Sequence, residues 1–144
     1  RNTLLPLFFP ILMATNLKWQ RKHKMDRAAL MAYITETYQE EHSSPWIKEP
    51  NYVVFRHGNN QKWFAVILDV PRVKLGLPGD GCLDVVNLKC DPIMISALRT
   101  ESGVFPAYHM NKEHWLSVAL DGSLPDDRLK MLLDMSYEAT AVKR

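Results

Sequence analysis

Residues 114–120 alternate between two kinds of side chain, and this alternation constrains the fold more than any other stretch of the chain. One set, in order, is His114, Leu116, Val118 and Leu120, and the other is Trp115, Ser117 and Ala119. Because successive side chains of a β-strand point to opposite faces of a sheet, a period of two is typical of a strand. Asp121-Gly122 follows and favours a turn. We therefore expect a strand over residues 114–120 with one apolar face.

The residues after this turn, Ser123-Leu124-Pro125-Asp126-Asp127, are typical of a helix start. Ser123 can cap free amide groups, and Pro125 with two aspartates suits a first turn. We expect a closing helix near residues 124–140 that buries Leu129, Leu132, Leu133 and Tyr137. Before the strand, Pro106 disfavours helix in the residue that precedes it, and we expect an extended segment over residues 106–111.

Earlier parts of the chain predict the remaining elements. Apolar residues recur at helical spacing from Asp26 to about residue 40. Two apolar stretches, 52–57 and 62–70, flank the turn residues Gly58-Asn59-Asn60 and predict a hairpin. Residues 71–81 predict a projecting loop, 83–89 a third strand, and 93–100 a short helix capped by Asp91. The fold class is therefore α+β: a mostly antiparallel sheet of at least four strands, packed by N- and C-terminal helices.

Composition restricts the class of protein. A chain of 144 residues with 47% hydrophobic content predicts one domain with a sizeable core. Its 18 basic and 16 acidic residues leave a net charge of +2, which by itself does not require a nucleic-acid partner. Cys82 and Cys90 lack nearby histidines at metal-ligand spacing, so we expect reduced thiols rather than a disulfide, and a cytoplasmic location.

Residues 1–24 differ from the rest of the chain. Leu4–Met13 is apolar but contains two prolines, and it is shorter than the roughly 20 residues that span a bilayer. Positive charge follows it over residues 18–24, which is the reverse of a signal peptide. We expect residues 1–24 to be an upstream extension or an engineered leader, and residues 25–144 to be a self-sufficient domain. A membrane partner is not expected; packing on a protein partner or on a second copy is the alternative role for residues 1–24.

The chain resembles the MmcQ/YjbR family of small bacterial proteins. The resemblance is strongest in Tyr108-His109-Met110-Asn111-Lys112, in His114-Trp115 and in Leu120-Asp121-Gly122-Ser123-Leu124-Pro125-Asp126, with support from Lys62-Trp63-Phe64. It extends from about Met25 to the C-terminal end. It implies a CyaY-like, frataxin-like α+β fold, also described as a double-wing DNA-binding fold, and a DNA-binding, regulatory function.

Local charge defines the candidate nucleic-acid-binding residues, which are Arg56, His57, Lys62, Arg72, Lys74, Lys112, His114 and Trp115. Two basic projections on one sheet would reach along the phosphate backbone of double-stranded DNA. Trp63 and Trp115 could stack on bases if exposed, and Trp115 is expected to be the more accessible of the two. In the alternative interpretation the basic residues are a solvated surface, both tryptophans are core, and the protein is an interaction or scaffold domain.

No catalytic, cofactor-binding or metal site is expected. The sequence lacks a nucleophile elbow, a phosphate-binding loop, a dinucleotide fingerprint and a zinc-protease motif. His109 and His114 would not share a helical face as paired zinc ligands do, and His114 is expected to be a core or boundary histidine. The acidic helix with which frataxins bind iron is missing here, because the first helix offers only Asp26, Glu36, Glu40 and Glu41 beside Arg27. Asp69 and Asp84 could lie near each other, but two isolated acids in sheet strands are usually solvated or paired with a cation rather than catalytic.

Overall fold

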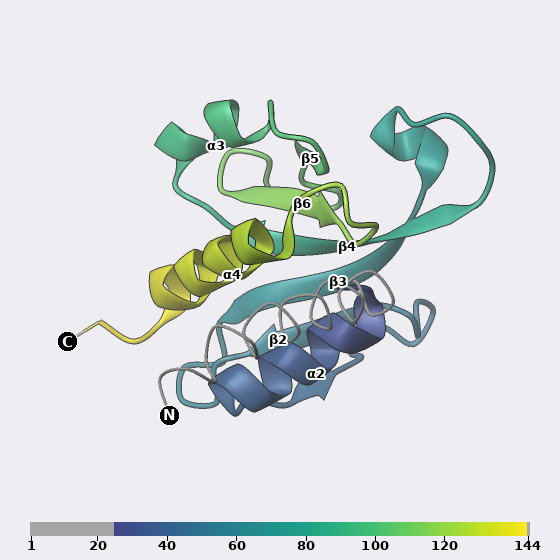
Figure 1. The fold of residues 1–144 in the computed structure, drawn as a ribbon. Helices are drawn as coiled ribbons and strands as arrows, with labels where there is room; N and C mark the ends of the chain where they lie inside the picture. The colour runs from purple at the N-terminus through teal and green to yellow at the C-terminus, as the bar shows by residue number, and fades with distance from the viewer. Residues whose placement is uncertain (1–24, 144) are drawn as a thin grey trace, which may run out of the picture.

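A computed structural model describes residues 25–143 of the chain. They form a six-stranded sheet in the order β1-β2-β3-β4-β6-β5, in which every neighbouring pair is antiparallel. The strands are β1 His42–Ser43, β2 Val53–Arg56, β3 Trp63–Pro71, β4 Cys82–Lys89, β5 Val104–Pro106 and β6 Trp115–Ala119. The helices are α2 Arg27–Tyr38, the 3-10 turn η1 Arg72–Leu75, α3 Pro92–Leu98 and α4 Asp126–Thr140 (Figure 1). The predicted α+β class is confirmed.

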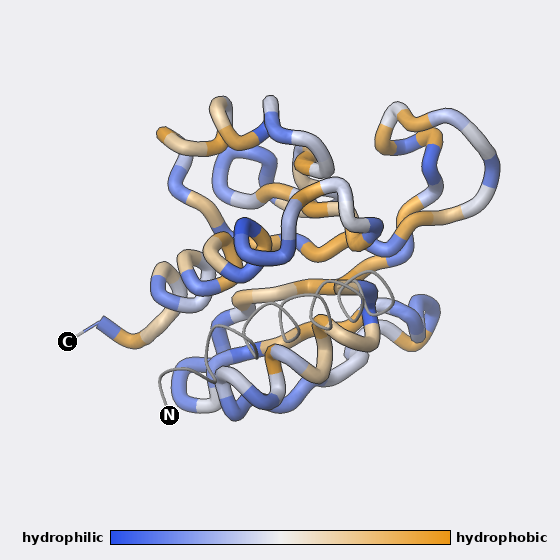
Figure 2. The backbone as a smooth tube through the Cα atoms, viewed as in Figure 1, coloured by the Kyte–Doolittle hydropathy of each residue, from blue (hydrophilic) through white to orange (hydrophobic). Residues whose placement is uncertain are grey.

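The main core lies between one face of the sheet and helices α2 and α4. These helices run next to each other, and the rings of Tyr38 and Tyr137 stack between them with centroids 4.4 Å apart (Figure 1). The largest fully buried side chains include Phe55, Phe64 and Leu30. Burying a side chain of this size stabilises the fold by roughly 1.5–3 kcal/mol. Hydrophobic residues accordingly follow the central strands, whereas most connecting turns are hydrophilic (Figure 2).

The opposite face of the sheet carries a second, smaller apolar cluster. It consists of Val54, Val66, Leu68, Val70 and Val85, with the partly buried Trp46, Tyr52, Trp63, Leu75 and Tyr108 packed against it. No α-helix of residues 25–143 contributes to this cluster, and its outer residues come from loops, from a strand end and from η1. We call this side of the sheet the open face.

The helix cap that the sequence predicts at Asp91 is present, and Asp26 caps α2 in the same way. Asp26 accepts a hydrogen bond from the amide of Ala29 at 2.9 Å, and Asp91 accepts one from the amide of Ile93 at 2.9 Å. Such caps satisfy amide groups that have no partner within the helix. The projecting loop over residues 71–81 is also confirmed, with η1 at its beginning.

The start of α4 corrects one prediction. Ser123 does not cap this helix; its amide donates to the Asp121 carboxylate at 2.9 Å, and α4 begins at Asp126 after Pro125 with no side-chain cap. Proline needs no amide partner, and the two aspartates of the first turn supply the negative charge that the helix dipole favours.

The segment before β6 is a second correction. Residues 106–111 are not extended throughout, because β5 ends at Pro106 and a turn follows in which His109 has a φ of 59°. The short edge strands β1 and β5 were not expected from the sequence, because two or three residues are too few to show a period.

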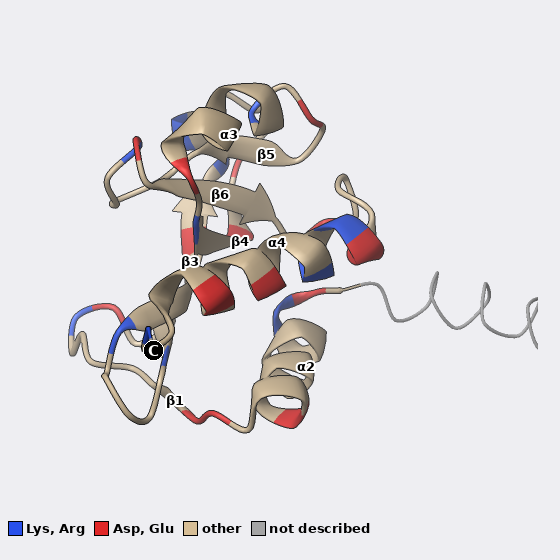
Figure 3. Cartoon of the chain, turned by 90° about the vertical axis from the view of Figure 1, so that its left-hand side faces the viewer, with Lys and Arg blue, Asp and Glu red and all other residues tan. Residues whose placement is uncertain are grey.

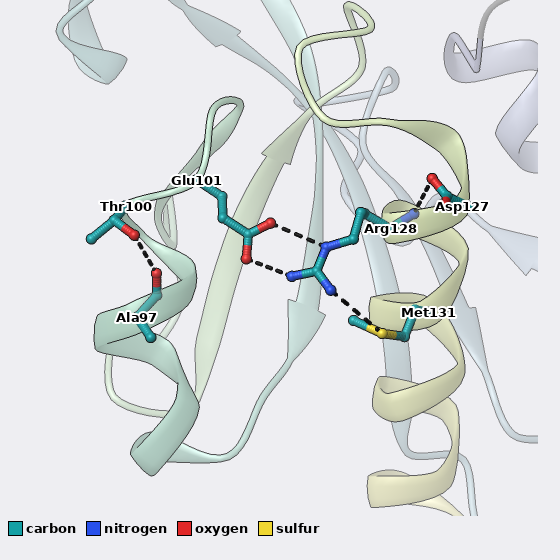
Figure 4. A network of polar contacts seen from close by, with 6 residues as sticks. All are labelled: Ala97, Thr100, Glu101, Asp127, Arg128 and Met131. Atoms are coloured by element: carbon teal, nitrogen blue, oxygen red, sulfur yellow. Dashed lines mark hydrogen bonds and ion pairs between the residues drawn. The ribbon is translucent and has the colours of Figure 1, made fainter.

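Ion pairs join the helices to the rest of the fold. Arg27 at the start of α2 contacts Asp84 on β4 at 3.0 Å, and Asp84 lies opposite Asp69 in the sheet, as expected. Arg128 on α4 binds both carboxylate oxygens of Glu101, which follows α3, at 3.2 and 2.5 Å (Figure 4). Partly exposed ion pairs contribute little to the free energy of folding. Their main effect is to fix the orientation of the helices relative to the rest of the fold.

Candidate functional site

A row of alternating cations and tryptophans crosses one end of the open face. Arg56 lies opposite Trp63 in the β2–β3 pair, with its guanidinium carbon 5.8 Å from the Trp63 ring centroid. Lys89 lies opposite Trp115 in the β4–β6 pair, with its Nζ atom 5.5 Å from the Trp115 ring. Since β2, β3, β4 and β6 are neighbours in the sheet, these residues form one basic–aromatic row. Each cation–π contact stabilises its pair by about 0.5–1 kcal/mol at an exposed site.

A hollow of about 320 Å³ opens beside this row. It is lined by Gln61, Lys62, Trp63, Lys89, Trp115, Ala139 and Thr140. Two lysines from different strand ends therefore face the same space. We call it the Lys62–Lys89 hollow.

An apolar pocket of about 300 Å³ lies next to it on the open face, and Trp63 belongs to both. The pocket is lined by Trp46, Tyr52, Trp63, Val66, Leu68, His109 and Met110. The Trp46 ring stands edge-on to Tyr52 and to Trp63, at centroid distances of 5.8 and 5.5 Å and interplanar angles of 81°. This edge-to-face geometry is the favoured one for aromatic pairs, so the rings hold one another in place. We call this space the aromatic pocket.

The segment that closes the aromatic pocket is held by two buried polar side chains of the sheet. Asn87 donates from its amide nitrogen to the Tyr108 carbonyl at 2.7 Å, and the Tyr108 amide donates to the Ser117 hydroxyl at 3.0 Å. The Ser117 hydroxyl in turn donates to the Asn87 side-chain oxygen. Both side chains are fully buried, where an unpaired polar group would cost free energy. The position of Tyr108, and with it of His109, is therefore set by the sheet.

A third hollow, of about 350 Å³, lies on the other side of this segment. It is lined by Lys74, Leu75, Phe105, Pro106, Ala107, Tyr108 and Lys112. Lys74 comes from η1 and Lys112 from the turn before β6, so the fold brings together two cations 38 positions apart in the chain. We call it the Lys74–Lys112 hollow. The ring of Tyr108 on its wall is 3.9 Å from the ring of His109 in the aromatic pocket.

Burial changes the ionisation of Tyr52 in the aromatic pocket. Burial, followed by the nearby carboxylate of Glu49, raises the pKa of Tyr52 above its ordinary value. The phenol is thus neutral at physiological pH. Tyr52 therefore adds a neutral aromatic wall to a pocket that lies between two groups of cations.

Three of the predicted nucleic-acid-binding residues lie free on the surface, and two are half-buried. Lys62, Lys74 and Lys112 are exposed. Arg72 uses its Nε atom to bond the Pro78 carbonyl at 2.9 Å, which braces the projecting loop. The Nε atom of Arg56 is buried and has no hydrogen-bond partner among residues 25–143.

Of the other three predicted residues, His57 and Trp115 need correction because they are buried. His57 is only 2% exposed, and its Nε2 atom lies 3.0 Å from the Tyr137 carbonyl and 2.8 Å from the Thr140 hydroxyl, so it joins β2 to the end of α4. Trp115 is 8% exposed and is more buried than Trp63, because the neighbouring strand and Lys89 cover it. His114 is exposed and precedes β6, so it is not a core histidine, and its assignment to nucleic-acid binding stays a prediction.

Lys89, Trp46 and Tyr52 belong to the site but were not predicted from the sequence. Lys89 ends an apolar strand, and Trp46 and Tyr52 flank a loop. The alternation around Lys89 could have indicated on which face of the sheet its side chain lies. It could not have indicated which strand lies next to it.

Charge elsewhere on the described surface is mixed. Lys and Arg positions are interspersed with Asp and Glu positions rather than gathered into one continuous band (Figure 3). Another hollow, of about 720 Å³, lies beside the segment after α2, β1 and the end of β2, and is lined by Glu40 and Glu41 as well as Arg56. Its carboxylates do not suit a phosphate ligand.

Residues 25–143 contain no group of three or more His, Cys, Asp or Glu side chains placed to hold a metal ion. None of their helices combines the length and the apolar character that a membrane span requires.

Comparison with known proteins identifies relatives. The sequence model of the family described as YjbR matches residues 24–139. The Bacillus subtilis (strain 168) protein YyaQ, described as uncharacterized, is 38% identical over 116 residues, which are 81% of this chain and 98% of YyaQ. Escherichia coli (strain K12) YjbR, also described as uncharacterized, is 48% identical over 54 residues, 37% of this chain and 46% of that protein.

A solved structure has the same fold. The crystal structure of a Pseudomonas syringae protein superimposes with a TM-score of 0.80 at 41% identity, covering 81% of this chain and all of that one. The family match spans most of the described residues and includes the Tyr108–Lys112 segment that closes the aromatic pocket. This chain belongs to the YjbR (MmcQ/YjbR) family.

Proposed function

We propose that this protein is a non-enzymatic DNA-binding module that makes weak, largely sequence-independent contacts with the phosphate backbone. The observation that supports the proposal is the position of four lysines around the open face: Lys62 and Lys89 in one hollow, Lys74 and Lys112 in another. Lysine ammonium groups neutralise phosphates and release condensed counterions, which is the main source of non-specific affinity. A regulatory role would follow from such binding.

The affinity should be modest. The net charge is +2, and carboxylates are interspersed among the basic side chains (Figure 3). A dissociation constant of roughly 10⁻⁴–10⁻⁶ M at physiological salt is the range of non-specific binders. The buried positions of His57 and Trp115 remove two of the predicted contacts, so the lysines supply most of the attraction.

The test is a titration of labelled duplex DNA at several salt concentrations. The log–log slope against salt should be about −0.9 per phosphate contact. Replacing Lys62 and Lys74 by alanine should make the slope shallower by roughly 2 units, because two contacts are lost. Arg99→Ala with Lys130→Ala removes the same charge from the C-cap of α3 and from α4, away from the two lysine hollows, and should leave the slope unchanged.

A protein-interaction or scaffold function is the second candidate. The aromatic pocket favours it, because aromatic side chains are enriched at binding interfaces. Absence of binding to duplex DNA at low salt, from a folded protein, would contradict the first proposal and leave this one.

A further inference from the structure

We propose that the aromatic pocket holds one unpaired base of a single-stranded nucleic acid, while the lysines of the two flanking hollows contact phosphates on either side. This inference rests on the proposed function: the same lysines hold phosphates, and the pocket adds a contact that only an unpaired base can make. A pocket of about 300 Å³ is at the lower limit of the range for small-molecule sites, which suits one flat group rather than a large ligand. Its walls are aromatic or aliphatic on nearly all sides.

The charges around the pocket favour a polyanion that crosses it. The Lys62–Lys89 hollow shares Trp63 with the pocket, and the Lys74–Lys112 hollow adjoins it through the Tyr108–His109 ring contact. Cations therefore lie on both sides of an apolar, ring-lined space. A nucleotide within a strand matches this order, since its base is flat and apolar on its faces and a phosphate lies on each side.

The pocket should bind single-stranded nucleic acid and not a duplex, because only an unpaired base exposes its faces. A base inside a duplex is stacked and paired, so its faces cannot contact a side chain. An unpaired base can stack on an aromatic ring, and because every base has such faces, the contact is tolerant of sequence. Trp46, with Trp63 held edge-on against it, supplies a ring whose orientation is fixed before the ligand arrives.

The wall of the aromatic pocket formed by His109 is also fixed before a ligand binds. Asn87 and Ser117 fix the backbone of Tyr108, and His109 follows it in the left-handed region with a φ of 59°. Lys89 is held over Trp115 by its cation–π contact. The ligand therefore has to order few side chains, which lowers the entropic cost of binding.

The experiment uses the full chain and three fluorescent probes at low salt: an oligothymidylate of about 12 nucleotides, an abasic strand of equal length, and a duplex of equal length. The oligothymidylate should bind more tightly than the abasic strand and quench tryptophan fluorescence. Trp46→Ala should weaken oligothymidylate binding roughly 5- to 150-fold, the range for loss of one base-stacking side chain, and leave binding of the abasic strand unchanged.

Matched variants control for folding. Ile47→Ala changes a side chain of the same loop that is 97% exposed, and it should leave all three affinities unchanged. His109→Asn removes an exposed ring of the pocket with a residue that tolerates positive φ, and it should weaken only the oligothymidylate. This second variant keeps the test valid if Trp46→Ala unfolds the protein.

The outcomes separate the two proposals. Equal affinity for all three probes, or oligothymidylate binding that neither pocket variant weakens, would overturn the base pocket while the phosphate contacts of the proposed function stand. No binding of any probe by folded protein would overturn both. Quenching by a proline-rich peptide, without binding of nucleic acid, would instead assign the pocket to a protein partner.

Discussion

Asn87 and Ser117 lie directly opposite each other on β4 and β6, and together they bond both backbone groups of Tyr108. Each is fully buried on the open side of the sheet, in positions that an apolar residue would otherwise occupy. The hydrogen bond between their side chains completes the set, so the two side chains and the Tyr108 backbone are joined by three hydrogen bonds. This pair couples the sheet to the segment that closes the aromatic pocket.

Replacing Asn87 by alanine should destabilise the fold by about 1–3 kcal/mol, because it leaves the Tyr108 carbonyl without its buried donor. Ser117→Ala should cost a similar amount, and the double variant less than the sum, with a coupling energy of about 0.5–3 kcal/mol. Urea unfolding of the four proteins measures this. Asn59→Ala, in an exposed turn, is the control. Strictly additive losses would mean that the two side chains do not act as a pair.

Gly103→Ala should destabilise the fold by roughly 1–3 kcal/mol. Gly103 has a φ of 83°, and an added Cβ atom would lie 2.9 Å from the Cβ of Ser123 and 3.0 Å from the amide nitrogen of Leu124. Gly76→Ala provides a matched comparison, since Gly76 has a φ of 72° with nothing within 4 Å of the added atom. Gly76→Ala should lower the free energy of unfolding by only about 1 kcal/mol, the cost of placing alanine at a positive φ. Similar urea midpoints for the two variants would contradict the steric part of this prediction.

The two thiols should differ in reactivity. Cys82 is exposed, whereas Cys90 is buried, and burial followed by the charge of Asp91 raises the pKa of the Cys90 thiol. Because the thiolate is the reactive form, Ellman's reagent at about pH 8 should modify one thiol quickly and the second only after denaturation. Cys82→Ser should abolish the fast phase. Two fast thiols in the folded protein would show that Cys90 is accessible.

Stability should fall at high pH because of Tyr38. Burial and the hydrogen bond from its hydroxyl to the Asp134 carboxylate raise the pKa of Tyr38 above its ordinary value. The unfolded chain ionises tyrosine near pH ~10, so the stabilisation is complete below that pH and is lost as the pH rises above it. The loss should be less than about 1.4 kcal/mol per pH unit, since solvent screens part of the ring.

Urea midpoints measured from about pH 8 to about pH 11 test this expectation, because they span the titration of unfolded tyrosine. Burial also raises the pKa of Tyr52 and of Tyr137, so some decline should remain in every variant. Tyr38→Phe should start from a lower stability, by about 1 kcal/mol for the lost hydrogen bond, and decline less steeply. Parallel curves for the two proteins would contradict the role of Tyr38.

Local pattern was sufficient to predict most elements of residues 25–143. The cap Asp91, the hairpin around Gly58-Asn59-Asn60 and the period of residues 114–120 each depend on neighbours within a few positions. Predictions were missed or wrong where the sequence pattern was short, as in β1 and β5, or ambiguous, as at the start of α4. Ser123 has the chemistry of a cap, but α4 begins three residues later, at Asp126 after Pro125. The proposal that residues 25–144 fold without residues 1–24 stays a prediction, since residues 1–24 lie outside the described part of the chain.

The candidate site depended on contacts between distant segments. The sequence alone identified Lys62, Lys74 and Lys112 as exposed cations, because lysines in turns seldom find a place in a core. It could not pair Arg56 with Trp63 or Lys89 with Trp115, since strand register is set by a bulge after Phe55 and by packing across β4 and β6. It also could not show that His57 is buried, because its partners Tyr137 and Thr140 lie 80 and 83 residues further along the chain. Secondary structure follows from interactions between near neighbours, whereas the surroundings of a side chain are decided only when distant elements pack together.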